Sequence, residues 1–162
     1  MKYILLIKKF LLLPWLFFLL SYGFCQSTKI DSLQQIIKNS KEDTAKVSTL
    51  IKLCDECRKA GDAAKAKENC DKALELSIKI SYLKGQGGAY ANMGMVYFSQ
   101  GDYEKTLENQ IKSLEITEVI GDKQGSAMSY NSMGNVYNKQ GNYNKALENY
   151  MKAQNLLESI GD

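Results

Sequence analysis

Hydrophobic and small residues recur along the chain at the spacing of an α-helix. In one segment the positions that share a face are Tyr90, Met93, Gly94 and Tyr97, which are three, four and seven residues apart. A second helix is expected to follow, with its apolar face at Leu107, Ile111 and Leu114. Between the two, Gly101 tolerates a positive φ at a helix end and Asp102 can cap the next helix. The pattern predicts a helical hairpin.

This hairpin pattern repeats with a period of forty residues. The segments 85–122 and 125–162 are identical at about half of their positions, and "GDYEKTLENQ" at 101–110 returns as "GNYNKALENY" at 141–150. A weaker copy lies forty residues upstream, around Leu50, Leu53, Gly61, Asp62 and Ala66. Because one hairpin cannot bury its own apolar face, the fixed period predicts a stacked array. Gly94 and Gly134, with Ala146 in the partner helix, indicate a close helix crossing, since mid-helix glycine costs about 1 kcal/mol.

The repeated residues resemble the tetratricopeptide repeat. The third copy carries the pattern of that family at Tyr130, Met133, Gly134, Tyr137, Ala146, Tyr150 and Ala153. The second copy departs from it at Thr106, Gln110 and Ser113, the first copy is degenerate, and the period of forty resembles a long-helix variant of the family. The resemblance implies an all-α solenoid, with hairpins at 44–83, 84–123 and 124–162. An additional helix is expected within residues 26–43, where Ile30, Leu33 and Ile37 form an apolar stripe.

The resemblance also implies where a partner would bind, because the first helices of such hairpins line a concave groove. The groove positions carried over to this sequence are Ile51, Asp55, Arg58, Ala91, Met95, Phe98, Asn131, Asn135 and Asn138. Met95 and Phe98 would expose large apolar side chains there, unless Phe98 packs on a neighbouring helix. The three asparagines form a polar ladder able to bond the main chain of an extended peptide. The family mostly binds proteins or peptides, so the expected partner is one of these and no cofactor is expected.

The first 25 residues have the pattern of a secretory signal peptide. Lys2, Lys8 and Lys9 precede the apolar run 10–20, and the small or weakly polar stretch "SYGFCQS" follows. The run is shorter than the roughly 20 residues of a membrane span. Export with cleavage after Cys25 is therefore predicted, which places the remaining chain on the extracytoplasmic side of the membrane. Lipid attachment at Cys25 and an uncleaved membrane anchor are the alternatives.

Charge and composition exclude several functions for the rest of the chain. Without residues 1–25, which hold three lysines and no acid, the 21 basic and 18 acidic residues become 18 of each. A net charge near zero disfavours nucleic-acid binding. The chain has no histidine, which removes the usual general base and the commonest metal ligand. Carboxylate pairs such as Asp55 with Glu56 are interpreted as solvated helix faces, so no enzyme activity is expected.

Three cysteines fall at positions that the repeat buries. Cys54 and Cys57 lie one helical turn apart and Cys70 lies on the next helix. They can be small core residues, a disulfide or half of a metal site, although no histidine or second Cys-x-x-Cys is present to complete such a site. Counted from the turn at 61–62, Cys54 and Cys70 lie at similar heights. If a disulfide forms after export, this pair is expected to form it.

The sequence as a whole predicts an exported scaffold that binds proteins or peptides. Its opening, "DSLQQIIKNSKEDTAKVSTLIKLC", loosely resembles the exported repeat regions of bacterial sensor proteins, which implies the sensing region of a larger signalling protein. The alternatives are the repeat arm of an extracytoplasmic enzyme and a stand-alone structural protein. Leu156, Leu157 and Ile160 are apolar near the end of the last helix. We therefore expect Leu156 and Ile160 to present an uncovered apolar face, and the array to continue with a further repeat. Membrane attachment would come from a later segment. The 162-residue piece alone is expected to self-associate through its last helix.

Overall fold

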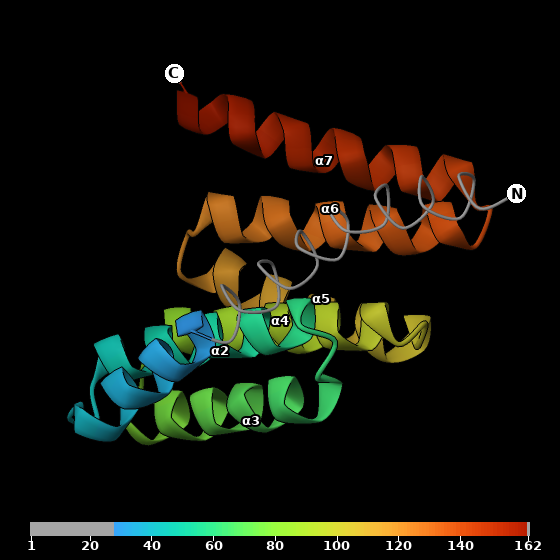
Figure 1. Cartoon of the computed structure of the whole chain (residues 1–162). Coiled ribbons are helices and arrows are strands. Elements are labelled where there is room, and N and C mark those ends of the chain that lie inside the picture. Colours follow the sequence, from blue (N-terminus) through green and yellow to red (C-terminus); the bar gives the residue numbers. More distant parts are fainter. Residues whose placement is uncertain (1–27, 162) are drawn as a thin grey trace, which may run out of the picture.

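The structure, a computed structural model, describes residues 28–161 as a stack of antiparallel helical hairpins (Figure 1). A helix over residues 28–39 precedes α2 (Thr44–Lys59), α3 (Ala63–Lys79), α4 (Leu83–Ser99), α5 (Tyr103–Val119), α6 (Lys123–Lys139) and α7 (Tyr143–Gly161). The hairpins are α2 with α3, α4 with α5, and α6 with α7, and α3 and α5 also pack on the first helix of the next hairpin. No strand occurs within these residues. The expected all-α solenoid is confirmed.

Four of the five turns between α2 and α7 are built from two chemical devices, and the turn before α4 lacks the second, because Tyr82 makes no side-chain cap hydrogen bond. The residue that ends the helix adopts a positive φ, as at Gly101 with φ +77°, where glycine carries no steric cost. The next residue caps the following helix: Asp102 accepts a hydrogen bond from the backbone N–H of Lys105 at 3.1 Å. Ser81 takes the same place after α3 with φ +54°, so one turn uses the left-handed conformation without glycine. The turn predicted from Gly101 and Asp102 is confirmed.

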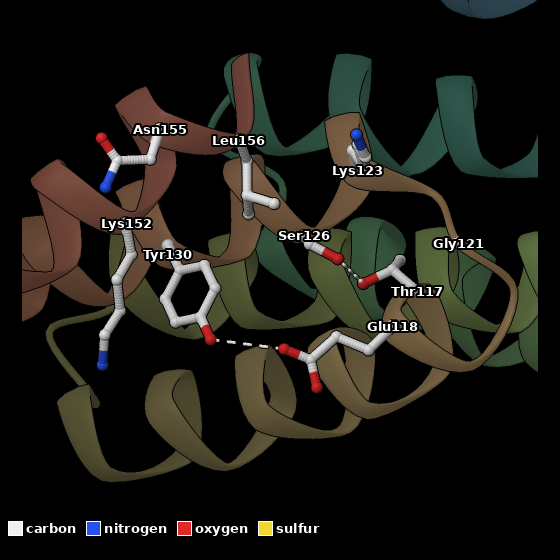
Figure 2. Close-up of a pocket in the computed structure, with 9 residues that line it drawn as sticks. All are labelled: Thr117, Glu118, Gly121, Lys123, Ser126, Tyr130, Lys152, Asn155 and Leu156. Atoms are coloured by element: carbon white, nitrogen blue, oxygen red, sulfur yellow. Dashed lines mark hydrogen bonds between the residues drawn. The ribbon is translucent and has the colours of Figure 1, made fainter. Parts of the chain in front are cut away.

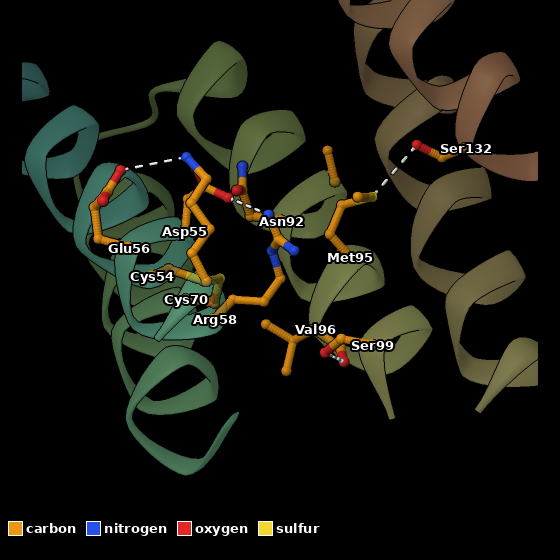
Figure 3. A network of polar contacts seen from close by, with 12 residues as sticks. Cys54, Asp55, Glu56, Arg58, Cys70, Asn92, Met95, Val96, Ser99 and Ser132 are labelled. Atoms are coloured by element: carbon orange, nitrogen blue, oxygen red, sulfur yellow. Dashed lines mark hydrogen bonds and ion pairs between the residues drawn. A yellow bond between two sulfur atoms is a disulfide. The ribbon is translucent and has the colours of Figure 1, made fainter. Parts of the chain in front are cut away.

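One contact between the two helices of each hairpin recurs at a fixed position but with different chemistry. In the first hairpin Cys54 and Cys70 form a disulfide with Cα atoms 5.6 Å apart (Figure 3). In the second, a Cβ atom added to Gly94 would lie 2.6 Å from Nε2 of Gln110. In the third, a Cβ added to Gly134 would lie 2.5 Å from a ring carbon of Tyr150. The glycines therefore mark a close crossing as expected.

The residue that fills the third crossing differs from the expectation. The sequence suggested Ala146 as the neighbour of Gly134, but the three nearest side-chain atoms all belong to Tyr150. Ala146 is buried elsewhere on the same face of α7. The small residue in α6 is therefore explained by an aromatic ring that crosses over it, and not by two small residues in contact.

The buried face of α5 is polar, which corrects the sequence prediction. Ile111 is 47% exposed, and Leu107 and Leu114 are only partly buried. The residues that α5 buries are Thr106, Asn109, Gln110, Ser113 and Thr117. Two of them bond to α6: the hydroxyl oxygens of Thr117 and Ser126 are 2.9 Å apart, and Ser129 donates to Ser113 at 3.1 Å. Hydroxyl pairs satisfy each other, so this seam can be buried without an unsatisfied group.

The helix over residues 28–39 covers one side of the first hairpin. Ile30, Leu33 and Ile37 pack against the buried cluster formed by α2, α3 and α4. Lys29 donates a hydrogen bond to Glu56 at 2.7 Å. Glu56 is itself only 8% exposed, so interpreting Asp55 and Glu56 as a fully solvated pair was wrong. The hydrogen bond from Lys29 outweighs burial and holds the pKa of Glu56 below its ordinary value.

At the other end of the stack lies α7, the last helix of the array (Figure 1). Leu157 and Ile160 are 44% and 50% exposed. Leu156 differs from the expectation: it is partly buried and lines a pocket with residues of α5 and α6. In α5 the position equivalent to Leu157 is Thr117, which α6 buries. The open face of α7 therefore includes Leu157 and not Leu156.

Candidate partner-binding groove

The first helices of the three hairpins form an inner layer. Within the described residues α2 contacts α4 and α4 contacts α6, whereas no such contact joins α3 to α5 or α5 to α7. An array whose first helices approach each other while its second helices spread apart must curve with the first helices inside. The sequence-predicted groove positions belong to α2, α4 and α6 and therefore lie on the inner layer. The curvature makes the side of this layer that faces away from the second helices the concave surface.

The part of the groove on α2 is charged but internally paired. Asp55 accepts from Arg58 and from Lys59, each at 2.6 Å. Burial raises the pKa of Asp55, but the hydrogen bonds from Lys59 and Arg58 outweigh it and keep that pKa below its ordinary value. Ile51 packs on α4, where its Cδ1 would lie 3.1 Å from a Cβ at Gly88. The ionised carboxylate of Asp55 is therefore neutralised within one helix.

On α4 the two large apolar residues predicted for the groove, Met95 and Phe98, make different contacts. Met95 is partly buried, and its sulfur accepts a hydrogen bond from the hydroxyl of Ser132 on α6 at 3.7 Å (Figure 3). Phe98 is also partly buried, and its ring lies 5.8 Å from the ring of Tyr103, the first residue of α5. This contact suits the alternative, in which Phe98 packs on the neighbouring helix, and the groove assignment of Phe98 stays a prediction. Ala91 is partly buried beside Met95.

On α6 the groove is polar and open. Asn131, Asn135 and Asn138 are all exposed. Ser132, which contacts Met95, precedes Asn135 by three residues, so Asn135 borders the α4–α6 contact. The hydroxyl of Tyr150 donates to Oδ1 of Asn135 at 2.8 Å. The sequence did not predict this bond, because the equivalent residues of the second hairpin, Met95 and Gln110, do not form one.

A separate pocket of about 450 Å³ lies between α5, α6 and α7 (Figure 2). Tyr130 is its central side chain: its hydroxyl donates to Glu118 at 3.3 Å, and Lys152 lies 5.6 Å above its ring. Burial and the nearby Glu118 carboxylate raise the pKa of Tyr130, which keeps the phenol protonated. The other lining residues are Thr117, Gly121, Lys123, Ser126, Asn155 and Leu156. Lys152 forms its ion pair outside the pocket, with Glu148 at 2.7 Å, and the pocket is not on the inner layer.

The described residues offer little for metal or thiol chemistry. Within residues 28–161 no group of three or more histidines, cysteines or acids could hold a metal ion. Cys57 is a buried free thiol, and burial raises its pKa, so it is a poor nucleophile. In the same part of the chain no helix has the length and apolar character needed to cross a membrane.

Comparison with known proteins agrees with this architecture. Residues 86–159 match the family model of the tetratricopeptide repeat. This segment consists of tetratricopeptide repeats. Arrays of this kind are in general protein-interaction scaffolds and not catalysts. Among curated proteins the sequence has no significant match.

Three solved structures illustrate how far the likeness of the tetratricopeptide array extends. The tetratricopeptide domain of FLU from Arabidopsis has 20% identity and a TM-score of 0.63, over 70% of this chain and 95% of that one. A STAND protein with a tetratricopeptide repeat sensor from Pyrococcus horikoshii has 23% identity and a TM-score of 0.72, over 84% of this chain and 21% of that one. A Rap protein complexed with competence and sporulation factor has 22% identity and a TM-score of 0.71, over 80% and 36%. At these identities the likeness shows the fold alone.

Proposed function

We propose that this chain is an exported scaffold whose inner layer binds an extended segment of a protein or a peptide. The observation that carries the proposal is the asymmetry of the groove between α4 and α6. The thioether of Met95 lies on one side, and the exposed amides of Asn131, Asn135 and Asn138 lie on the other. In an extended peptide, successive side chains point to opposite faces, and the main-chain amides point to the edges. An apolar residue beside a row of amides suits such a ligand better than it suits a compact polyanion or a small metabolite.

Selection from a displayed library of random dodecapeptides tests the groove directly. The selected peptides should bind the native protein, and Asn131→Ala or Asn135→Ala should each weaken binding about 3- to 10-fold, because each removes a hydrogen bond worth about 1 kcal/mol. Asn144→Ala is the matched control, since Asn144 is an exposed asparagine on the outer helix α7. Equal affinities for all three variants would place the binding surface elsewhere.

We propose further that the chain serves signal transduction as the sensing region of a larger protein. Support comes from two of the structures of the same fold: one is a signal-transduction ATPase with a repeat sensor, and the other is a Rap protein bound to competence and sporulation factor. The chain spans 21% and 36% of those proteins. Sequencing the gene beyond codon 162 tests this role: a signalling output domain would support it, and a catalytic domain would favour a substrate arm instead.

Export is supported by two independent features of the chain. The basic start and apolar run of residues 1–25 suit a signal peptide, although they lie outside the described residues. The buried disulfide between Cys54 and Cys70 suits an oxidising compartment, where such bonds persist. Mass spectrometry of the protein from its native host should give an N-terminus near Gln26. Recovery of intact Met1, or of a lipid on Cys25, would replace simple cleavage by one of the alternatives.

Self-association through α7 is the second interaction that we propose. Its support is the exposed apolar surface of that helix, including Leu157 and Ile160. Light scattering at high micromolar concentration should show a mass above that of the monomer, and Leu157→Glu should restore the monomer. The matched control is Ile78→Glu on α3, which also replaces an exposed aliphatic side chain but lies far from α7 in the chain. A monomer in the native protein, or the same mass for both variants, would contradict this interaction.

A further inference from the structure

Tyr150 reaches from the outer helix α7 to the edge of the groove. Its ring lies over Gly134, where a Cβ atom would come within 2.5 Å of Cε1 and 3.1 Å of Cζ. Its hydroxyl then donates to Oδ1 of Asn135 at 2.8 Å. The absence of a side chain at residue 134 is therefore what allows a phenol anchored in α7 to contact a groove residue on α6.

This hydrogen bond determines which end of the Asn135 amide remains free. A primary amide has one acceptor oxygen and two N–H donors. A phenol donates more readily than it accepts, because its lone pair is delocalised into the ring, so the arrangement with Oδ1 toward Tyr150 is favoured over the flipped one. Asn135 is exposed, and its Nδ2 therefore remains available as a donor at the groove.

Asn135 is distinguished by this bond from the other groove asparagines. Among the described residues no side chain hydrogen-bonds to the amide of Asn131 or Asn138, so those two can present either a donor or an acceptor. The second hairpin has no equivalent: its crossing residue Gln110 donates instead to the carbonyl of Ala91 at 3.0 Å, and Met95 stands at the position of Asn135.

We propose that Tyr150 is a positioning residue of the groove, which fixes the Asn135 amide so that α6 presents an N–H donor there and selects a main-chain carbonyl of an extended partner. The inference rests on the proposed function, since it assumes that a peptide lies along the inner layer. Tyr150 itself makes no contact with the partner. Its role is to fix the orientation of the Asn135 amide, whereas the amides of Asn131 and Asn138 can present either a donor or an acceptor.

The positioning step can be tested without any ligand. Tyr150→Phe removes the hydroxyl and keeps the ring over Gly134, while Tyr137→Phe is the matched control, because the Tyr137 ring lies under Lys145 and its hydroxyl has no hydrogen-bond partner among the described residues. In NMR spectra the Asn135 side-chain amide should report one rotamer in the native protein and in Tyr137→Phe. In Tyr150→Phe it should report rotational averaging. An unchanged amide signal in Tyr150→Phe would overturn the positioning role, whether or not peptides bind.

The selection step uses a dodecapeptide obtained from the displayed library, synthesised with each amide replaced in turn by an ester. An ester carbonyl is a weaker acceptor, so one replacement should weaken binding to the native protein about 3- to 10-fold. The ester also removes an N–H, and the decisive quantity is therefore the coupling between the ester and Tyr150→Phe. We expect the parent peptide to bind Tyr150→Phe less tightly, with no further loss at that ester, and Tyr137→Phe to behave as the native protein. Identical ester profiles for the native protein and Tyr150→Phe would overturn the selection, whereas failure to select any peptide would overturn the proposed function and leave the NMR result to decide the positioning role.

Discussion

The first and third hairpins close the same crossing in opposite ways. In the first, Cys54 and Cys70 are joined covalently. In the third, Gly134 gives up its side chain and the ring of Tyr150 fills the space. The second hairpin lies between these solutions, since Gln110 crosses Gly94 with its Oε1 buried and without a hydrogen-bond partner. The repeat thus preserves the place of the contact and not its chemistry, so each hairpin has a different physical source of stability.

Removing the disulfide should have the largest effect on this comparison. The double variant Cys54→Ala with Cys70→Ala should lose about 3 kcal/mol of unfolding free energy, because the bond closes a loop with a sequence separation of 16 residues and so restricts the unfolded chain. Urea denaturation measures the loss, and a reducing agent should bring the native protein to the stability of the variant. Equal denaturation midpoints with and without reductant would show that packing alone holds this crossing.

The two glycine crossings should respond differently to an added methyl group. Gly134→Ala meets the rigid ring of Tyr150 at 2.5 Å, whereas the closest atom to Gly94→Ala is Nε2 at the flexible end of Gln110. Both variants gain about 1 kcal/mol of helix propensity, and overpacking costs about 1–3 kcal/mol. We expect Gly134→Ala to be less stable than Gly94→Ala by at least about 1 kcal/mol in thermal or urea denaturation. The reverse order would mean that the Tyr150 ring can move aside.

Gln110→Met tests whether the polar side chain at the second crossing stabilises the protein. The variant keeps a long, unbranched side chain over Gly94 and removes the buried Oε1 that has no partner. It also removes the bond to Ala91, so the expected result is a neutral change or a gain of up to about 1 kcal/mol in unfolding free energy. A loss of about 2 kcal/mol or more, beyond what a methionine swap in a core costs, would show that the Gln110 amide stabilises the crossing.

The smallest effect concerns the helix that covers only the first hairpin. The pKa of Glu56 is lowered in the folded state, chiefly by the hydrogen bond from Lys29. A lowered folded-state pKa contributes stability above the unfolded-state value, and this contribution disappears as the pH falls through the folded-state pKa. Glu56→Gln should therefore lose up to about 1 kcal/mol at neutral pH and none at the acid end of the titration. Melting curves of the variant and the native protein should converge as the pH falls from neutral into the acid range, and parallel curves would contradict this account.

Much of the fold could be predicted because the same residue types recur at equivalent positions of the repeat. Gly101 with Asp102 marked the turn, and two mid-helix glycines marked the crossing. The buried face of α5 was predicted wrongly because two sets of residues there share helical spacing, and hydrophobicity favoured Leu107 and Ile111 over Thr106 and Ser113. The other copies carried the correcting signal, since alanine stands in both at the position of Thr106 and at that of Ser113. A position that is small in every copy is buried even where its residue is polar.

The candidate groove could be predicted only in part. The repeat assigns helix faces, and the resemblance carries those faces over to the inner layer, which is how Met95 and the asparagines became groove candidates. The repeat pattern does not predict which residues a side chain contacts near the end of its helix. Phe98 is the next-to-last residue of α4, and Tyr103 is near enough to pack against its ring. The bond between Tyr150 and Asn135 depends on how far the Tyr150 ring projects past Gly134. The packing of α7 on α6 determines this distance, and the repeat pattern does not give it.

The two junctions between hairpins also differ, and this difference bears on how the array assembles. Ser113 and Ser129 bond to each other across α5 and α6, while the equivalent residues across α3 and α4 are Ala73 and Ala89, buried in one apolar cluster. Repeat chains are prone to pairing the wrong neighbours while they fold. Docking α3 onto α6 would leave the hydroxyl of Ser129 buried against alanine without a partner, at a cost of about 1–3 kcal/mol. The serine pair thus disfavours docking of α3 onto α6 and favours the order in which the hairpins are stacked.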